Sequence, residues 1–123
     1  MQEVLKYILI AFMSGLLLYG IATSLIMIIK VPRPNKFVGF KTKENVLDDG
    51  LWKWSNKMVG IFYLIGNVLS LAAFIPLVLL LKDKILSFAL VGLIVVMLVY
   101  LFIIDFIFKK KVKEKYEQLE NKK

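Results

Sequence analysis

The sequence predicts an all-α integral membrane protein with three transmembrane helices, and three observations support this fold class: composition, three uncharged runs and the shortness of the chain. Of the 123 residues, 59% are hydrophobic, above the roughly 45–50% typical of a soluble domain. The excess lies in three stretches without charge, at residues 7–29, 58–81 and 85–104. Each matches the ~20 residues that a helix needs to cross ~30 Å of hydrocarbon. A soluble fold would have to bury all three helices on every side, and a chain of this length lacks the material to do so.

We expect one membrane domain over residues 1–123, with spans at about 5–30, 56–81 and 85–108, a folded cytoplasmic loop at 31–55 and a basic, helical cytoplasmic tail at 109–123. The first run is longer than the ~7–15 apolar residues of a signal peptide and lacks a small-residue cleavage site, so we expect it to be retained. Pro32 and Pro34 end the first helix because proline has no backbone N–H to donate. The connection at residues 82–84 is so short that the second and third helices form an antiparallel hairpin.

Lysine and arginine residues are divided unevenly between the two sides of the membrane. One precedes the first uncharged run and two lie between the second and third runs, whereas seven lie between the first and second runs and seven follow the third. The first loop and the tail share a side, which carries 14 of the 17 positive residues. The positive-inside rule makes that side cytoplasmic and places the N-terminus outside. The formal charge of +8 therefore indicates topology and attraction to anionic lipid headgroups, not binding to nucleic acid.

The residue types present argue against catalysis. The chain contains no cysteine and no histidine. Their absence removes the usual zinc ligands, the thiol nucleophile and the commonest general base. We therefore expect no enzyme activity, no catalytic residue, no metal site and no cofactor.

Two polar residues interrupt the apolar runs. Asn67 lies near the middle of the second span, where an unpaired amide is costly, so we expect it to face another helix as a structural link or as a ligand contact. Asp105 ends the third span, and Lys109 follows four residues later in the order that favours a helical ion pair. We favour an ion pair at the membrane boundary, and the alternative is an acid in a proton relay.

Two helix faces offer surfaces for packing. The first span carries small residues at four-residue steps, which would let another helix approach closely: Ala11 with Gly15, and Gly20 with Ser24. The tail repeats apolar residues at four- and three-residue steps, namely Val112, Tyr116 and Leu119. This stripe has three candidate neighbours: the membrane surface, the first loop or a partner protein.

The loop between the first two spans has the residues of a folded cap. Gly39 would allow a positive φ angle, and Asn35 and Thr42 could tie down backbone groups. Trp52 is expected in the headgroup region as an interfacial aromatic residue. Lys41 would present a positive charge near the headgroups. The alternative is that the loop only joins two helices and carries the positive charge that topology requires.

The loop and the start of the second helix place several residues at fixed spacing: Pro34, Asn35, Gly39, Lys41, Thr42, Trp52, Asn56, Lys57 and Gly60. This order resembles the signature of the SdpI family, bacterial membrane proteins named for immunity to a secreted killing peptide. Lys41 stands where that family usually has arginine, so it keeps the charge but lacks the planar fork for two-pronged recognition. The resemblance covers about 27 residues closely and the three-helix pattern loosely. It implies a short, three-span member in the bacterial cell membrane.

The resemblance implies that the chain protects the producing cell from a toxic peptide or bacteriocin. As a mechanism we hypothesise direct sequestration of the peptide within the bilayer, by the helix faces around Asn67 and the cap around Lys41. A second hypothesis is a signalling or scaffold protein whose loop and tail recruit a cytoplasmic regulator, such as a transcriptional repressor. A third is a small-solute transporter, which would require a homo-oligomer because three spans without a strongly buried charge form no pathway alone. Membrane lipids are expected partners in all three. The candidate binding residues are Asn35, Gly39, Lys41, Thr42, Trp52, Asn56 and Lys57, with Asn67 and Asp105 as intramembrane polar residues.

Cysteine labelling tests the topology, because the native chain has no cysteine to interfere. In intact cells, the Asp83→Cys variant should react with an impermeant thiol reagent, since residue 83 is expected outside. The Lys43→Cys variant should not react until the membrane is permeabilised. The reverse pattern would contradict the orientation.

Overall fold

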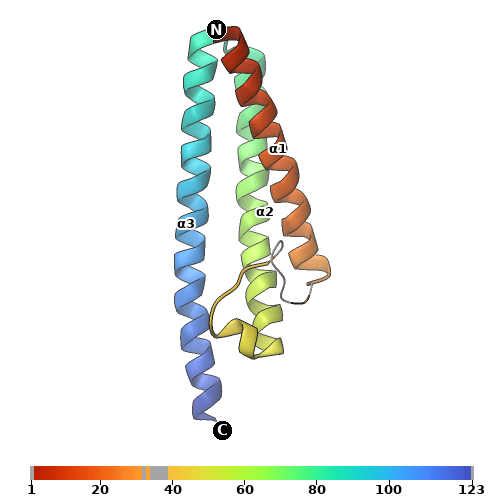
Figure 1. The fold of residues 1–123 in the computed structure, drawn as a ribbon, viewed down its shortest axis with the longest axis vertical. Coiled ribbons are helices and arrows are strands. Elements are labelled where there is room, and N and C mark those ends of the chain that lie inside the picture. Colours follow the sequence, from red (N-terminus) through yellow and green to blue (C-terminus); the bar gives the residue numbers. More distant parts are fainter. Residues whose placement is uncertain (1, 32, 34–38, 123) are drawn as a thin grey trace.

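The computed structural model describes residues 2–31, 33 and 39–122. These residues form three long helices and one short 3-10 helix (Figure 1): α1 Gln2–Ile29, η1 Asn45–Leu47, α2 Asp49–Leu80 and α3 Asp83–Asn121. Each long helix is long and apolar enough to cross a membrane. The prediction of an all-α protein with three transmembrane helices is therefore confirmed. Pro32, Pro34 and Asn35 lie outside the described residues.

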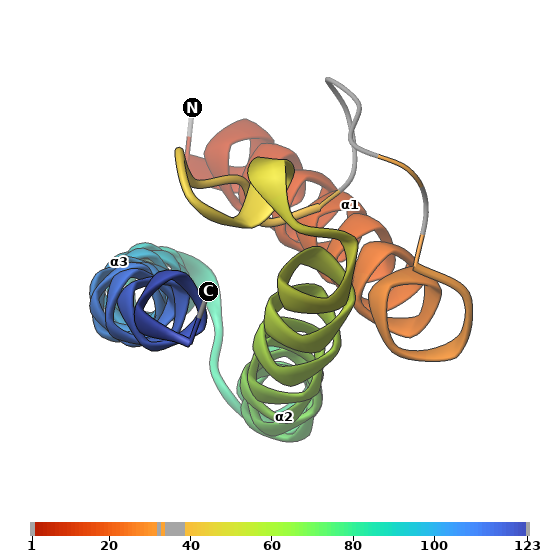
Figure 2. The ribbon, with the colours of Figure 1, turned by 90° about the horizontal axis from the view of Figure 1, so that it is seen from below.

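The three long helices run side by side, with the N-terminus and the α2–α3 connection at one end and the C-terminus at the other (Figure 1). Seen along their length, they occupy the corners of a triangle (Figure 2). α1 stops well before the first turns of α2 and the last turns of α3, which project beyond it together with residues 39–48. We call this part of the molecule the loop end.

Local chemistry explains where the helices begin and end. The Asp48 carboxylate caps α2 by accepting a hydrogen bond from the Leu51 backbone N–H at 2.8 Å, which satisfies one of the free donors of the first turn. Leu81 and Lys82 are extended and lead directly into α3, so the predicted hairpin is confirmed. α2 begins earlier than the expected span at 56–81, and α3 continues without interruption from its apolar part into the charged tail.

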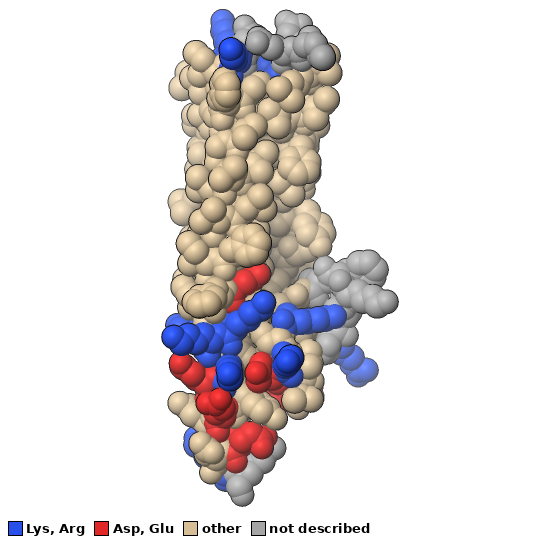
Figure 3. Space-filling model, turned by 60° about the vertical axis from the view of Figure 1, so that its left-hand side comes forward, with Lys and Arg blue, Asp and Glu red and all other residues tan. Residues whose placement is uncertain are grey.

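The long middle part of the molecule has an uncharged surface. Figure 3 shows few charges along this part, lysine and arginine at both ends, and acidic residues gathered at the loop end. Leu18, Leu80 and Phe102 are each more than 70% exposed, as expected of side chains that face lipid.

Small residues let α1 and α2 approach closely. A Cβ added at Gly60 would lie 2.8 Å from the Met27 Cβ and 3.2 Å from the Ser24 carbonyl oxygen. Ser24 is fully buried. Gly20 lies against Asn67, since a Cβ there would come within 2.8 Å of the amide carbon. The predicted packing face is confirmed for Gly20 and Ser24.

The other predicted pair does not pack in this way. A Cβ at Gly15 would meet nothing within 4 Å, and Ala11 is exposed. Both residues lie on a side of α1 that faces away from α2. The four-residue spacing of small residues identified the packing face at Gly20 and Ser24. The same spacing at Ala11 and Gly15 occurs on a face that does not pack, and spacing alone could not distinguish the two faces.

Two apolar clusters hold the helices together. One lies toward the N-terminal end and consists of Met13, Leu17, Phe74, Leu86 and Leu90. The other lies at the loop end and consists of Met27, Phe40, Leu51, Val59, Ile104, Phe108 and Val112. The second cluster includes the loop through Phe40 and the tail through Val112. Tyr116 also packs against it, so the first two residues of the apolar stripe of the tail lie on the chain's own loop end.

The close approach of α1 and α2 predicts different outcomes for two Gly→Ala changes. Gly60→Ala should lower the thermal unfolding midpoint in detergent, because overpacking typically costs about 1–3 kcal/mol. Gly15→Ala is the matched control, since the methyl group that it adds would meet no atom within 4 Å. Equal midpoints for the two variants would contradict the close contact.

Candidate functional site

The loop cap begins at a glycine with an unusual backbone conformation. Gly39 has a φ angle of +123°, in a region that residues with a Cβ rarely adopt. An added Cβ would lie 3.1 Å from the Asn56 Oδ1 and 3.1 Å from the Trp52 ring. Backbone conformation and close packing both require glycine here, and the predicted positive φ angle is confirmed.

Asn56 binds both backbone groups of Phe40, the residue after this glycine. The Phe40 N–H donates to the Asn56 Oδ1 at 2.6 Å, and the Asn56 Nδ2 donates to the Phe40 carbonyl at 3.2 Å. The same Nδ2 also donates to the Trp52 carbonyl at 2.9 Å. Asn56 is completely buried. Its amide therefore attaches the loop to the first turns of α2.

Asn45 completes the cap from the other side. Its Nδ2 donates to the Phe40 carbonyl at 2.8 Å and to the Ser55 hydroxyl at 3.0 Å. Its Oδ1 accepts from the Thr42 N–H at 2.8 Å, and its own N–H donates to the Thr42 hydroxyl at 3.0 Å. Asn45 and Ser55 are fully buried. Two buried amides thus fix the backbone from Phe40 to Asn45.

A second polar region lies within the apolar part of the helices. The Asp105 carboxylate on α3 accepts a hydrogen bond from the Tyr63 hydroxyl on α2. The Tyr100 hydroxyl donates to the Phe62 carbonyl at 2.6 Å, which links the same two helices. The Tyr100 ring lies so close to Gly66 that a Cβ there would overlap it.

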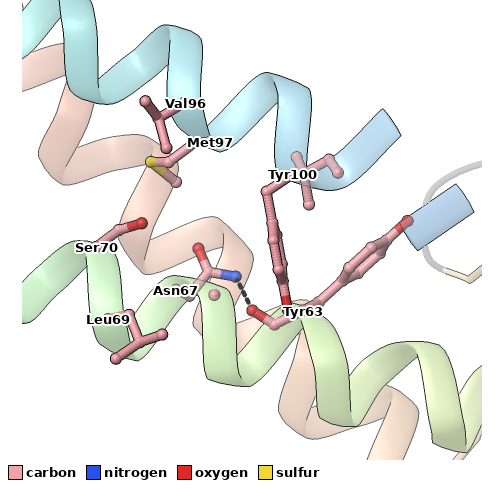
Figure 4. Close-up of a pocket in the computed structure, with 9 residues that line it drawn as sticks. Tyr63, Asn67, Leu69, Ser70, Val96, Met97 and Tyr100 are labelled. Atoms are coloured by element: carbon pink, nitrogen blue, oxygen red, sulfur yellow. Dashed lines mark hydrogen bonds between the residues drawn. The ribbon is translucent and has the colours of Figure 1, made fainter. Parts of the chain in front are cut away.

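Asn67 faces the protein interior, as predicted, and is only 6% exposed. Its Nδ2 donates to the Tyr63 carbonyl of its own helix at 2.8 Å. Figure 4 shows the Asn67 and Ser70 side chains in the space between α2 and α3, and the Asn67 amide also lies against Gly20 of α1. Among the described residues no hydrogen bond reaches the Asn67 Oδ1 or the Ser70 hydroxyl. Since every fully buried polar side-chain atom described has a partner, these two atoms remain open to the adjoining cavities.

Two cavities meet at Asn67. A small pocket of about 140 Å³ lies between α2 and α3 and is lined by Asn67, Ser70 and Tyr100 among others (Figure 4). A larger cavity of about 280 Å³ lies between the three long helices, and we call it the membrane groove. Its lining includes Leu16 and Thr23 of α1, Tyr63 and Asn67 of α2, and Leu101 and Asp105 of α3. The groove combines apolar walls with a carboxylate, an amide and three hydroxyl-bearing side chains, those of Tyr19, Thr23 and Tyr63. Among the described residues, no group of three or more acidic, histidine or cysteine side chains could hold a metal ion.

The chain was compared with known protein families, curated proteins and solved structures. The model of the SdpI/YfhL protein family matches residues 30–105. The chain belongs to the SdpI/YfhL protein family. No curated protein and no solved structure gives a significant match. The matched region of this SdpI/YfhL protein includes both amides of the cap and the Tyr63–Asp105 pair.

The structure brings together only part of the predicted loop site. Gly39, Thr42, Trp52 and Asn56 meet in the cap around Phe40. Lys41 and Lys57 are exposed and lie outside its hydrogen bonds. Asn35 lies outside the described residues.

Two expectations for individual residues were wrong. Trp52 is 3% exposed and covers Gly39, so it is a core residue of the cap and not an interfacial anchor. Asp105 forms no ion pair with Lys109, because its carboxylate turns toward Tyr63 on the neighbouring helix. Helical spacing favoured the pair with Lys109, but it could not show that a tyrosine from α2 would compete.

Sequence reasoning missed Asn45 and Tyr63 as site residues. Thr42 and Asn45 lie three residues apart, a spacing that allows reciprocal hydrogen bonds between side chain and backbone. That local signal was available. The contacts of Asn45 with Ser55 and of Tyr63 with Asp105 depend on the fold, and no sequence spacing indicates them.

The cap predicts different effects for neighbouring substitutions. Asn45→Ala should speed trypsin cleavage after Lys43 in the detergent-purified protein, because it leaves buried polar groups unpaired at a cost of about 1–3 kcal/mol. Val46→Ala is the control, since Val46 is 44% exposed. Cleavage of both variants at the wild-type rate would show that Asn45 does not hold the loop.

Proposed function

We propose that this SdpI/YfhL protein is an immunity-type membrane protein, which protects a bacterial cell by holding a toxic peptide in the bilayer along the membrane groove. Family membership supports the class of function. The observation that carries the mode of action is the set of polar side chains that line the groove, those of Tyr63, Asn67 and Asp105.

A peptide inside hydrocarbon needs partners for its polar groups, because each unpaired group costs several kcal/mol. The membrane groove offers acceptors in the Asp105 carboxylate and the Asn67 amide oxygen, beside apolar walls that include Leu16 and Leu101. Asp105 is only partly buried and forms no ion pair with a described residue. It would therefore favour a ligand that brings a positive charge or an N–H donor.

In this proposal the loop end lies in the cytoplasm and the N-terminus lies outside, as the positive-inside rule requires. Asp105 then occupies the cytoplasmic half of the membrane. A peptide that inserts from outside would therefore be held only after it has reached the cytoplasmic half of the membrane.

A second candidate function is recruitment of a cytoplasmic regulator by the loop end. The observation that favours it is the packing of loop, α2 and tail into one charged surface: Val112 is fully buried in the loop-end cluster, and the Lys115 ammonium lies 3.9 Å from the centre of the Trp54 ring. Because this surface is already ordered, its lysines can bind a partner without the entropy cost of ordering the loop.

A protection assay tests the groove. The chain is expressed in a sensitive bacterium that is challenged with candidate killing peptides. Asp105→Asn and Asn67→Leu should each reduce protection, because the first removes the carboxylate charge from the groove and the second removes the amide oxygen. Glu114→Gln is the matched control, since it removes a carboxylate from the exposed tail. Membrane levels of every variant are compared by immunoblot.

The same assay separates the two candidate functions. Replacing Lys110 and Lys111 by glutamine should leave protection intact if the groove neutralises the peptide, and should reduce it if the tail recruits a partner. Gly39→Val should reduce protection only if the cap takes part. Groove variants that protect like the wild type at normal membrane levels would overturn the proposed mode of action.

A further inference from the structure

Four lysines from distant parts of the chain converge at the loop end. A groove of about 600 Å³ lies between the loop and α3, and its lining is Lys41, Thr42, Lys43, Glu44, Val46, Lys109 and Lys113. We call it the lysine groove. Its ionisable side chains, four lysines and one glutamate, give a formal net charge of +3.

Both walls of the lysine groove are held in place. On the loop side, the buried Asn45 fixes the backbone at Phe40 and Thr42. On the α3 side, Phe108 and Val112 are anchored in the loop-end cluster. The fold therefore brings the four lysines together, and their meeting does not depend on surrounding headgroups or ions.

The positive charges in the lysine groove are not neutralised by the protein. In the described part of the chain, none of the four lysines forms an ion pair. Lys109 and Lys113 are four residues apart on one helix face, where like charges repel. A bound anion would relieve this repulsion, and lysine binds phosphate as a point charge.

The lysine groove lies at the boundary of the apolar surface. Phe102 and Phe106, which lie on the same face of α3 as Lys109 and Lys113, are 75% and 71% exposed, as expected of side chains in contact with lipid. Figure 3 shows a band of lysine and arginine at the border between the uncharged part of the molecule and the charged loop end. Phospholipid phosphates lie at this level, just outside the hydrocarbon.

We infer that the lysine groove binds the headgroup of an anionic phospholipid that carries two phosphates, such as cardiolipin. Its volume falls within the ~300–1,000 Å³ typical of small-molecule sites, which suits a headgroup larger than one phosphate. Basic pockets at the cytoplasmic side of membrane helices are suited to such headgroups. The acyl chains would then lie along the exposed Phe102 and Phe106. This inference does not depend on toxin binding or on the membrane groove.

Lipid titration of the full-length, detergent-purified chain tests the site. Cardiolipin and phosphatidylglycerol are added at equal total charge, and bound lipid is counted by native mass spectrometry. The wild type should bind one cardiolipin in preference to two molecules of phosphatidylglycerol. Lys43→Gln with Lys113→Gln should weaken cardiolipin binding about 30-fold, the loss expected for two lysines near an anionic headgroup.

A double variant with the same charge change serves as the control. Lys53→Gln with Lys110→Gln removes two exposed lysines that do not line the lysine groove, and it should change cardiolipin binding by less than about threefold. Equal losses for the two double variants would overturn the site and leave only general attraction to the basic surface.

A competition with soluble pyrophosphate distinguishes a lipid from a free phosphate compound. Pyrophosphate at the concentration of cardiolipin should not displace the bound lipid, because it lacks acyl chains to contact Phe102 and Phe106. Displacement at equal concentration would overturn the assignment to a lipid. Loss of cardiolipin binding together with intact protection from killing peptides would separate this site from the proposed function.

Discussion

The loop end depends on how the two backbone groups of Phe40 are satisfied. They belong to a residue that is only 6% exposed, and a buried backbone group without a partner is destabilising. The amides of Asn56 and Asn45 supply the partners from opposite sides. This arrangement holds the Phe40 ring in the loop-end cluster and requires Gly39 beneath the Trp52 ring. The cap, the position of the tail and the lysine groove all depend on it.

Within the apolar region, the same need for partners is met by carbonyls of α2. Tyr100 and Asn67 donate to the carbonyls of Phe62 and Tyr63, which are adjacent in the sequence. A carbonyl oxygen has two lone pairs, so it can accept a side-chain donor as well as its helical N–H. These contacts satisfy donors in a region without water, but they leave the Asn67 oxygen facing the cavities. That remaining acceptor makes the region suitable for a ligand.

Asp105 and Lys109 illustrate how neighbouring helices decide the use of a side chain. They are one turn apart on α3, yet the carboxylate pairs with Tyr63, whereas Lys109 lines the lysine groove with residues of the loop. The Asp105 carboxylate lines the membrane groove, whereas the Lys109 side chain lies at the membrane boundary. A single helical turn thus separates the proposed peptide site from the proposed lipid site.

The sequence alone determined the fold class, the three helices, the hairpin and the positive φ angle of Gly39, because these follow from run length, charge and local backbone chemistry. It also carried the family signature. The tertiary structure alone decided the pairs of Tyr63 with Asp105 and of Asn45 with Ser55, the burial of Trp52, and the meeting of Lys43 with Lys113. The physical reason is that a helix apolar on every side has no stripe to fix its rotation, so only packing against its neighbours selects which side chains meet.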